Sequence, residues 1–320
     1  MLKKISVFTV VFTFLVGATA FAATYSGKKV LYIDSYHPGY PWSDSITEGV
    51  EDVLKGSGVE LKIIHMDTKR KKEKEQIEQA ALAAKDVIES FKPDVVIAAD
   101  DNASKFLVMP YYKNTSLPFV FCGLNWDASG YGYPYSNATG MVEVSLIEPL
   151  LSNMKGYAKG GKIGYLSSDV LSSTKEAVYY KKLFNISFAE EKHVGTFADW
   201  KAAFKEMHET MDMVIVGNQS GINDWNEAEA LAWAQANTRV VSGTVYDFLT
   251  PFSVMGITKV GQEQGIWSAK TALEILDGKS PSSIPIVQNE KGEMYANVTL
   301  ASKAGVVFKP ALLKNATVIK

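Results

Sequence analysis

The chain has 320 residues, with 33 lysines and arginines against 35 aspartates and glutamates, which gives a formal net charge of −2 at pH 7. This near-neutral balance excludes the strongly basic surface that favours nucleic acid as a partner. The length suffices for two domains of ordinary size.

The first 22 residues have the pattern of a secretory signal peptide. Lys3 and Lys4 form a basic start, residues 5–16 form an apolar core too short to span a bilayer, and Ala20-Phe21-Ala22 matches a cleavage site. We therefore expect cleavage after Ala22 and a periplasmic mature protein. No later segment has 18 unbroken apolar residues, and no cysteine stands at the cleavage site to carry a lipid.

After the signal comes the stretch that organises the first domain. Residues 30–33 form an apolar run typical of a buried parallel strand, residues 34–42 form a loop rich in proline, glycine and aromatics, and a helix follows. Ligands in open α/β sheets bind at the carboxyl ends of strands. We interpret this loop as a wall of a ligand site, with the alternative that its aromatics only pack over the edge of the sheet.

Strands and helices then alternate. Further strands are predicted at 59–66, 95–99 and 117–123, and a loop rich in Gly, Tyr, Pro and Ser covers 127–139. The pattern restarts with strands predicted at 162–166, 187–194, 213–217 and 239–242. This alternation predicts an α/β fold with two doubly wound parallel sheets. The only cysteine, Cys122, lies in an apolar run, so we expect a buried thiol rather than a reactive one.

The helix containing Ile266 and Leu276 has no place in the second set, and its return to the first domain predicts several crossings that act as a hinge. We therefore assign residues 23–124 and about 247–284 to a first lobe. Residues from about 125 to 246 and 285–320 are assigned to a second lobe.

Polar and aromatic residues gather in the loops after the predicted strands, where they suit a small polar ligand with a flat surface. Some of these residues stand where helix N-caps are expected, and roughly half of those are expected only to cap the start of a helix. The loops after the first set of predicted strands contribute Ser35, Tyr36, His37, Trp42, Asp100, Asp101, Asn102, Asn125 and Trp126. The loops after the second set contribute Ser168, Asn218, Tyr246 and Asp247.

Motifs for catalysis and for cofactors are missing from the sequence. It contains no H-E-x-x-H, C-x-x-C, G-x-S-x-G, P-loop or G-x-G-x-x-G pattern, so we expect no metal, no cofactor and no catalytic residue. A hydrolase that uses a Ser–His–Asp triad at the predicted ligand site is kept as an alternative to a binding function.

Together these segments resemble a known family, the substrate-binding proteins of ABC importers with the type I periplasmic binding fold, in the group that includes tryptophan-binding relatives. The resemblance spans nearly the whole mature chain and rests on the segments SYHPGYPW (35–42), MDTKR (66–70), VFCGLN (120–125), NATG (137–140), GQEQG (261–265) and ILDGK (275–279). It implies two Rossmann-like lobes, a three-segment hinge and a ligand enclosed between the lobes.

From this resemblance we expect a monomer that binds an amino acid or similar small molecule, with a sugar as the alternative ligand, and that docks on an ABC permease in the inner membrane. Similar domains also serve as sensory ectodomains. A binding module that reports to a separate signalling receptor is therefore the alternative function.

Overall fold

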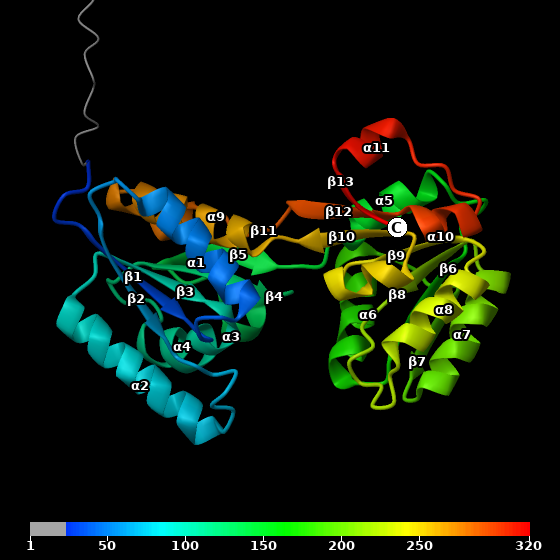
Figure 1. Cartoon of the computed structure of the whole chain (residues 1–320). Helices are drawn as coiled ribbons and strands as arrows, with labels where there is room; N and C mark the ends of the chain where they lie inside the picture. The colour runs from blue at the N-terminus through cyan, green and yellow to red at the C-terminus, as the bar shows by residue number, and fades with distance from the viewer. Residues whose placement is uncertain (1–23) are drawn as a thin grey trace, which may run out of the picture.

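A computed structural model describes residues 24–320, so the predicted signal peptide, residues 1–22, lies outside the described residues. The chain forms two α/β lobes joined side by side by a few extended segments (Figure 1). The first sheet has the strand order β11-β5-β4-β3-β1-β2, and the second has the order β13-β12-β10-β9-β8-β6-β7. The predicted fold class, with two sheets wound by helices, is confirmed.

Lobe 1 comprises residues 24–143 and 261–288. Its first strand is fully buried because alternate side chains face two helical layers: Val30 and Tyr32 pack with α1 and α9, whereas Leu31 and Ile33 pack with α2. Its elements are β1 (Lys29–Asp34), α1 (Pro41–Leu54), β2 (Glu60–His65), α2 (Lys74–Phe91), β3 (Val95–Ala99), α3 (Asp100–Ala103), the π-helix η1 (Ser104–Val108), α4 (Met109–Tyr111), β4 (Phe119–Asn125), η2 (Ala128–Tyr131), β5 (Ala138–Glu143), α9 (Gly261–Leu276), η4 (Pro281–Ser283) and β11 (Val287–Gln288).

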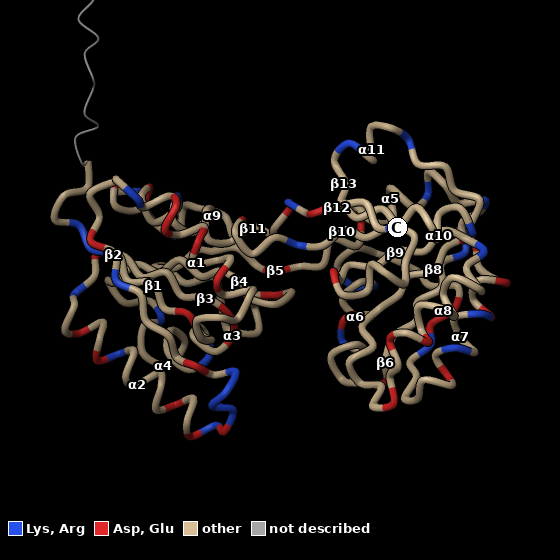
Figure 2. The backbone as a smooth tube through the Cα atoms, in the orientation of Figure 1, with Lys and Arg blue, Asp and Glu red and all other residues tan. Residues whose placement is uncertain are grey.

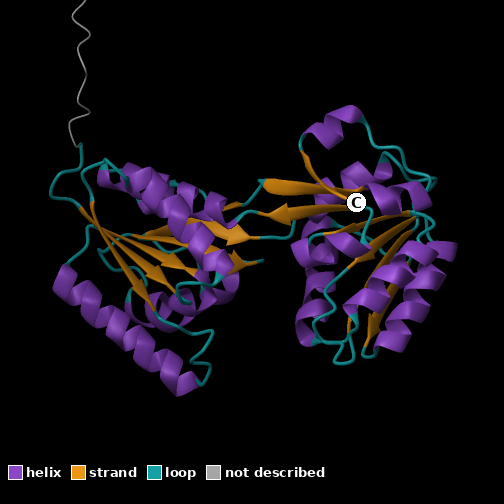
Figure 3. Ribbon diagram, in the orientation of Figure 1, coloured by secondary structure: helices purple, strands orange, loops and turns teal. Residues whose placement is uncertain are grey.

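Lobe 2 comprises residues 147–259 and 292–320, and it is layered in the same way (Figure 3). Tyr165 faces the side covered by α5 and α6, and Leu166 faces the side of α7 and α8. Its elements are α5 (Ile147–Lys155), β6 (Ile163–Ser168), α6 (Leu171–Phe184), β7 (Glu190–Val194), α7 (Phe197–Thr210), β8 (Met213–Val216), α8 (Glu227–Asn237), β9 (Val241–Thr244), η3 (Asp247–Phe252), β10 (Met255–Lys259), β12 (Gly292–Asn297), α10 (Val298–Lys303), α11 (Pro310–Lys314) and β13 (Ala316–Ile319).

The chain crosses between the lobes three times, at residues 144–146, at Val260 and at residues 289–291. These positions differ from the predicted lobe boundaries. Strand β5 pairs with β4 in the first sheet, so residues 125–143 stay in lobe 1, and β10 pairs with β9, so residues 247–259 stay in lobe 2. A short buried strand has the same apolar pattern in either sheet, which is why the sequence misplaced both.

One pairing departs from the predicted parallel arrangement. Strand β12 runs antiparallel to β10, with Met255 opposite Ala296 and Lys259 opposite Gly292. The antiparallel pair forms because β12 enters lobe 2 from the third crossing, beside the second crossing at the end of β10. The two crossings therefore lie next to each other, and together with the end of β5 they form the hinge region.

Helix α9 returns from lobe 2 to lie against α1, and glycines permit the close contact. A Cβ atom at Gly265 would lie 2.0 Å from the carbonyl oxygen of Ile46, and one at Gly49 would lie 2.4 Å from that of Gln262. Any larger side chain would push the helices apart. The two helices come from distant parts of the chain, so lobe 1 depends on this close contact.

Among the described residues, no helix is long and apolar enough to cross a membrane.

Candidate functional site

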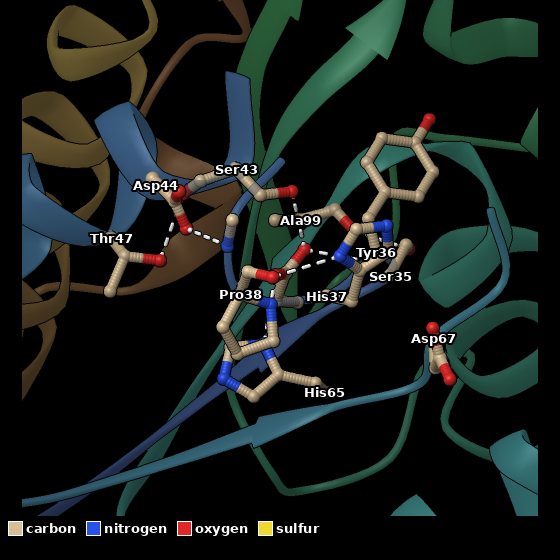
Figure 4. Close-up of polar contacts among 12 residues, drawn as sticks. Ser35, Tyr36, His37, Pro38, Ser43, Asp44, Thr47, His65, Asp67 and Ala99 are labelled. Atoms are coloured by element: carbon tan, nitrogen blue, oxygen red, sulfur yellow. Dashed lines mark hydrogen bonds and ion pairs between the residues drawn. The ribbon is translucent and has the colours of Figure 1, made fainter. Parts of the chain in front are cut away.

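Asp34 anchors the loop that follows β1. This buried carboxylate accepts the backbone N–H of Tyr36 at 2.8 Å and the hydroxyl of Ser43 at 2.9 Å, and its second oxygen lies 2.9 Å from Nδ1 of His65. Figure 4 labels the three partner residues, Tyr36, Ser43 and His65, and marks polar contacts in this region with dashed lines. The loop is therefore held at its base by the first turn of α1 and by the end of β2, while its crest at Gly39 is exposed.

Two predicted site residues brace this scaffold. The buried hydroxyl of Ser35 donates to the carbonyl of Ala99 at 2.5 Å and accepts the N–H of Ala103 at 2.9 Å. Asn102 donates to the hydroxyl of Thr68 at 2.8 Å, and that hydroxyl donates to the carbonyl of Ser35. The structure thus gives Ser35 and Asn102 positions that tie the loop to the end of β3.

Asp100 is the most unusual residue of the predicted site. It has a backbone φ of +66°, it is 1% exposed, and its Oδ1 accepts the indole N–H of Trp42 at 3.1 Å. Its Oδ2 is buried and has no hydrogen-bond partner among the described residues. Burial raises the pKa of this carboxyl well above its usual range, and the charges of Glu143 and Asp34 raise it further.

Asp101 forms a neighbouring cluster. Its Oδ2 accepts the amide of Asn125 at 2.6 Å, and its Oδ1 accepts the hydroxyl of Tyr131 at 2.7 Å. Figure 2 shows the acidic positions of α3 and of the end of β5 on the side of lobe 1 that faces lobe 2. This edge of lobe 1 therefore presents carboxylates to the space between the lobes.

The aromatic residues of the first loop lie face to edge. The rings of Tyr36 and Tyr40 are 5.2 Å apart at 74°, and His37 is 6.0 Å from Tyr40. The ammonium group of Lys69 lies 4.2 Å from the centroid of the Tyr36 ring and 5.1 Å from that of Tyr40. In this structure Lys69 therefore covers the rings of Tyr36 and Tyr40, and His37 meets Tyr40 edge to face.

Trp126 lies between the lobes rather than in a pocket. Its ring stacks on Tyr179 of α6 at 5.2 Å and 4°, meets Tyr180 edge to face, and packs against the cores of both lobes. Beside it, Asp127 forms an ion pair with Lys182 at 3.6 Å. Helix α6 is thus the element of lobe 2 that contacts lobe 1 at this point (Figure 1).

In lobe 2, two predicted residues hold their own loops. The buried Ser168 hydroxyl lies 3.3 Å from that of Ser173, and Asn218 accepts the N–H and the hydroxyl of Ser220. Tyr246 and Asp247 follow β9 instead and face the space between the lobes, as the pocket described below shows.

Sequence reasoning missed Glu176, a buried carboxylate on α6. It accepts hydroxyl groups from Ser145 at 3.1 Å, from Tyr165 at 3.0 Å and from Tyr246 at 2.9 Å. Burial and this carboxylate both raise the pKa of the Tyr246 hydroxyl, which keeps it protonated as a donor. Glu176 therefore connects the first crossing, at Ser145, with the wall of the cleft at Tyr246. The sequence gives only a weak sign of this burial: Glu176 lies on the same face of the helix as Ala177 and Tyr180.

A pocket of about 520 Å³ opens beside the hinge, and both lobes line it; we call it the hinge-side pocket. It brings together the predicted residues Trp42, Tyr246 and Asp247 and adds the second crossing. Its other lining residues are Tyr40, Pro41, Ser45, Val245, Phe248, Thr258, Lys259, Val260, Gly261, Glu293 and Tyr295.

A larger pocket of about 820 Å³ contains Asn125, Tyr131 and residues of α2, η1 and α4, together with Tyr179 from lobe 2. The predicted site is therefore divided: some residues line one of the two pockets, and others support the loops from behind. Residues 24–320 contain no group of three or more His, Cys, Asp or Glu arranged to hold a metal ion.

Comparison with known proteins gives a consistent picture. The family model for ABC transporter substrate binding proteins matches residues 37–320. The ligand-free, open form of CD0873, a substrate-binding protein with adhesive properties from Clostridium difficile, aligns with a TM-score of 0.70 at 15% identity, covering 92% of this chain and 99% of that one. No curated protein sequence matches the chain.

Two further structures share the fold. An ABC domain from Streptococcus pneumoniae in complex with L-Trp aligns with a TM-score of 0.57 at 16% identity, covering 92% of this chain and all of that one. A periplasmic ribose ABC transporter protein from Conexibacter woesei aligns with a TM-score of 0.56 at 15% identity, covering 92% and 99%.

Proposed function

Because the chain belongs to the family of ABC transporter substrate-binding proteins, we propose that it binds a small organic molecule, an amino acid or a close relative, in the hinge-side pocket and delivers it to an ABC permease. This family consists of binding proteins rather than enzymes, in keeping with the lack of catalytic motifs. The observation that carries the proposal is that both lobes and a crossing line one pocket.

The proposed mechanism is closure of the lobes around the ligand. Trp42 and Tyr40 of lobe 1 offer flat faces on one side of the pocket, and Tyr246 and Phe248 of lobe 2 offer them on the other. A ligand held by both sets stabilises the state in which they are closest, so binding shifts the population toward the closed form. The three crossings are the segments that bend.

A thermal-shift screen of the mature chain tests the binding function. The library contains amino acids, sugars, nucleosides and small organic acids, with L-tryptophan as the first probe. A ligand at about 100 times its dissociation constant adds roughly 2.7 kcal/mol to the free energy of unfolding, which raises the melting temperature measurably. Protein that has been unfolded and refolded serves as the control for a ligand carried over from expression. No shift with any class after refolding would contradict the proposal.

Trp42→Ala sharpens the same test. Loss of the indole removes an aromatic wall of the pocket, so we expect the affinity for the hit from the screen to fall at least about thirtyfold. Leu82→Ala, an exposed apolar residue of lobe 1 that does not line this pocket, is the matched control and should keep its affinity. Unchanged affinity in Trp42→Ala would move the ligand away from the hinge-side pocket.

We further propose that the protein acts in the periplasm as a monomer after cleavage behind Ala22. The first residue of the exported protein should be Ala23, which N-terminal sequencing measures. Replacing Lys3 and Lys4 with glutamate should impair export because the basic start is lost. For the role in import rather than sensing, the liganded protein should raise the ATPase rate of its cognate ABC permease, and a lack of stimulation would favour a signalling receptor as the partner.

A further inference from the structure

Acidic groups outnumber basic groups around the hinge-side pocket. Asp247 and Glu293 line it, and Lys259 is its only lysine or arginine among the described lining residues. The ammonium group of Lys259 is already paired with Glu143, a carboxylate that is 7% exposed at the end of β5. A carboxylate on a ligand therefore finds no free cationic side chain here, whereas an ammonium group finds acceptors that have no cation of their own.

The aromatic faces near this pocket already bind ammonium groups. In the hinge-side pocket, Lys259 places its Nζ 5.4 Å from the centroid of the Trp42 ring. Tyr36 and Tyr40 lie just before Trp42 in the chain, and Lys69, from the segment after β2, covers their rings in the same manner. Such distances are those of cation–π contacts, so these rings are oriented to receive positive charge.

Behind Trp42 lies a buried carboxylate oxygen without a partner. The indole N–H of Trp42 donates to Oδ1 of Asp100, while Oδ2 has no hydrogen-bond donor among residues 24–320. Burial and the charges of Glu143, Asp34 and Asp101 disfavour the ionised form of this carboxyl. A cation in the pocket is the charge that would favour the ionised form and offset this cost.

From these three observations we infer that the ligand is an organic cation: a molecule with a flat apolar ring and a protonated amine, recognised through the amine and needing no carboxylate. The ammonium group lies against Trp42 and the acidic rim, and the ring lies among Tyr40, Tyr246 and Phe248. This inference rests on the proposed function and specifies the chemistry of its ligand.

Lys259 becomes a competitor of the ligand under this inference. Its ammonium group holds both Glu143 and the face of Trp42, which are the groups that a ligand amine needs. Removing Lys259 should therefore strengthen the binding of an amine. If the pocket instead recognised a carboxylate, Lys259 would be its only ion partner and its removal would weaken binding, so the two models predict changes of opposite sign.

The test uses three probes with one ring system and different charges: tryptamine, L-tryptophan and indole-3-propionate. Isothermal titration calorimetry on the mature protein should show that tryptamine binds at least as tightly as L-tryptophan, and that indole-3-propionate binds at least about tenfold more weakly. Lys259→Gln should bind tryptamine several-fold more tightly. Lys279→Gln, an exposed lysine paired with Glu274 outside the pocket, is the control and should bind as the wild type does.

Two results would overturn the inference. One is binding of indole-3-propionate as tight as that of tryptamine, and the other is weaker binding of tryptamine by a Lys259→Gln protein whose melting temperature is unchanged. If none of the three probes binds, an uncharged or anionic hit in the thermal-shift screen overturns the inference and leaves the solute-binding function standing, whereas a cationic hit supports it. A screen without any hit counts against the proposed function itself.

Discussion

A buried carboxyl group lies behind the cleft in each lobe, Glu176 in lobe 2 and Asp100 in lobe 1, and the two are in opposite condition. Glu176 accepts three hydroxyl groups, so both of its oxygens are bonded. Asp100 has one oxygen bonded to Trp42 and one without a partner among the described residues, and its backbone has a positive φ. A buried polar group without a partner costs roughly 1–3 kcal/mol, so Asp100 carries an unfavourable feature that Glu176 lacks.

This difference assigns different work to the two sides. The satisfied carboxylate fixes Tyr246 and the first crossing, which is a structural task. Asp100, the unsatisfied one, lies behind Trp42, the wall of the pocket that we propose receives the ligand. A positive charge on the ligand can stabilise the ionised form of Asp100 there. Functional sites commonly retain such destabilising groups, and removing them commonly gains stability and loses activity. The following experiments test this comparison.

Removing the Glu176 side chain should have the largest effect. Glu176→Ala leaves the hydroxyl groups of Ser145, Tyr165 and Tyr246 without their acceptor in a buried site, so we expect a loss of about 3 kcal/mol in the free energy of unfolding. Urea denaturation measures this. Glu148→Ala, an exposed glutamate on α5, is the control and should change stability little. If Glu176→Ala and Glu148→Ala both change the free energy of unfolding little, Glu176 does not have the structural role assigned to it.

Asp100→Asn should shift stability in the other direction. Asparagine tolerates a positive φ and its Oδ1 still accepts the Trp42 N–H, but it carries no charge. Because the pKa of Asp100 is raised in the folded protein, its contribution to the free energy of unfolding is fully present below about pH 4 and is lost as pH rises toward the raised pKa. We therefore expect the variant to be more stable than the wild type at pH 8 and nearly equal to it at pH 4.

The same substitution should weaken the binding of tryptamine, because a bound cation favours the ionised form of Asp100 and the variant has no carboxyl group to ionise. Denaturation curves at both pH values and calorimetry on one protein preparation give the two readings together. A variant that is less stable than the wild type at pH 8 would show that the Asp100 charge is satisfied in solution, and the comparison with Glu176 would fail.

Lobe 2 should respond to acid through His208. Burial and the nearby charge of Arg239 lower the pKa of this histidine to about 3, and its Nδ1 lies 3.3 Å from the backbone nitrogen of Arg239. A lowered histidine pKa gives stability that is present above the unfolded value of about 6.5 and is lost as pH falls below it. Between pH 8 and pH 5 this loss is about 2 kcal/mol.

The response of lobe 2 is therefore opposite in sign to that of Asp100. In His208→Gln the loss on going from pH 8 to pH 5 should be smaller than in the wild type by about this amount, as measured by urea denaturation at each pH. His37→Gln, on the partly exposed loop, should keep the wild-type dependence. An unchanged acid dependence in His208→Gln would place the sensitive group elsewhere.

The smallest effect is expected at the contact between the lobes. Tyr179→Ala removes the stack on Trp126 without altering the strained backbone of Trp126, and such a stack contributes about 1 kcal/mol. We expect that loss in stability and a broader distribution of lobe separations in small-angle X-ray scattering. Val178→Ala, the exposed neighbour on α6, should leave both unchanged. Identical scattering from Tyr179→Ala and the wild type would show that the crossings alone set the separation.

Much of the fold could be predicted because burial imposes periodicity. The apolar runs at 30–33 and 95–99 are buried strands, and Cys122 is buried as expected. The lobe boundaries could not be predicted, because β5 and β10 have sequences that suit either sheet. Strands β12 and β13 were missed since their side chains are partly exposed and lack an apolar run.

The site was harder because its features depend on three-dimensional contacts. A strand-end aspartate in the sequence gives no sign that Asp100 lacks a partner for one oxygen, and a loop tryptophan gives no sign that Trp126 stacks across the two lobes. Trp42, Tyr246 and Asp247 line one pocket, and the sequence could group them because the carboxyl ends of parallel strands meet at one edge. Whether the other predicted residues touch a ligand stays a prediction.

The packing of α9 against α1 also governs the order in which the protein can fold. A growing chain has made every strand of the first sheet except β11 by Glu143, yet the groove on α1, with Gly49 at its floor, stays uncovered until residues 261–276 have been synthesised. Lobe 2 in turn needs β12 and β13 from the final stretch. Both lobes are therefore completed only late in synthesis, and contacts between such distant segments favour slow folding of the whole chain as one cooperative unit.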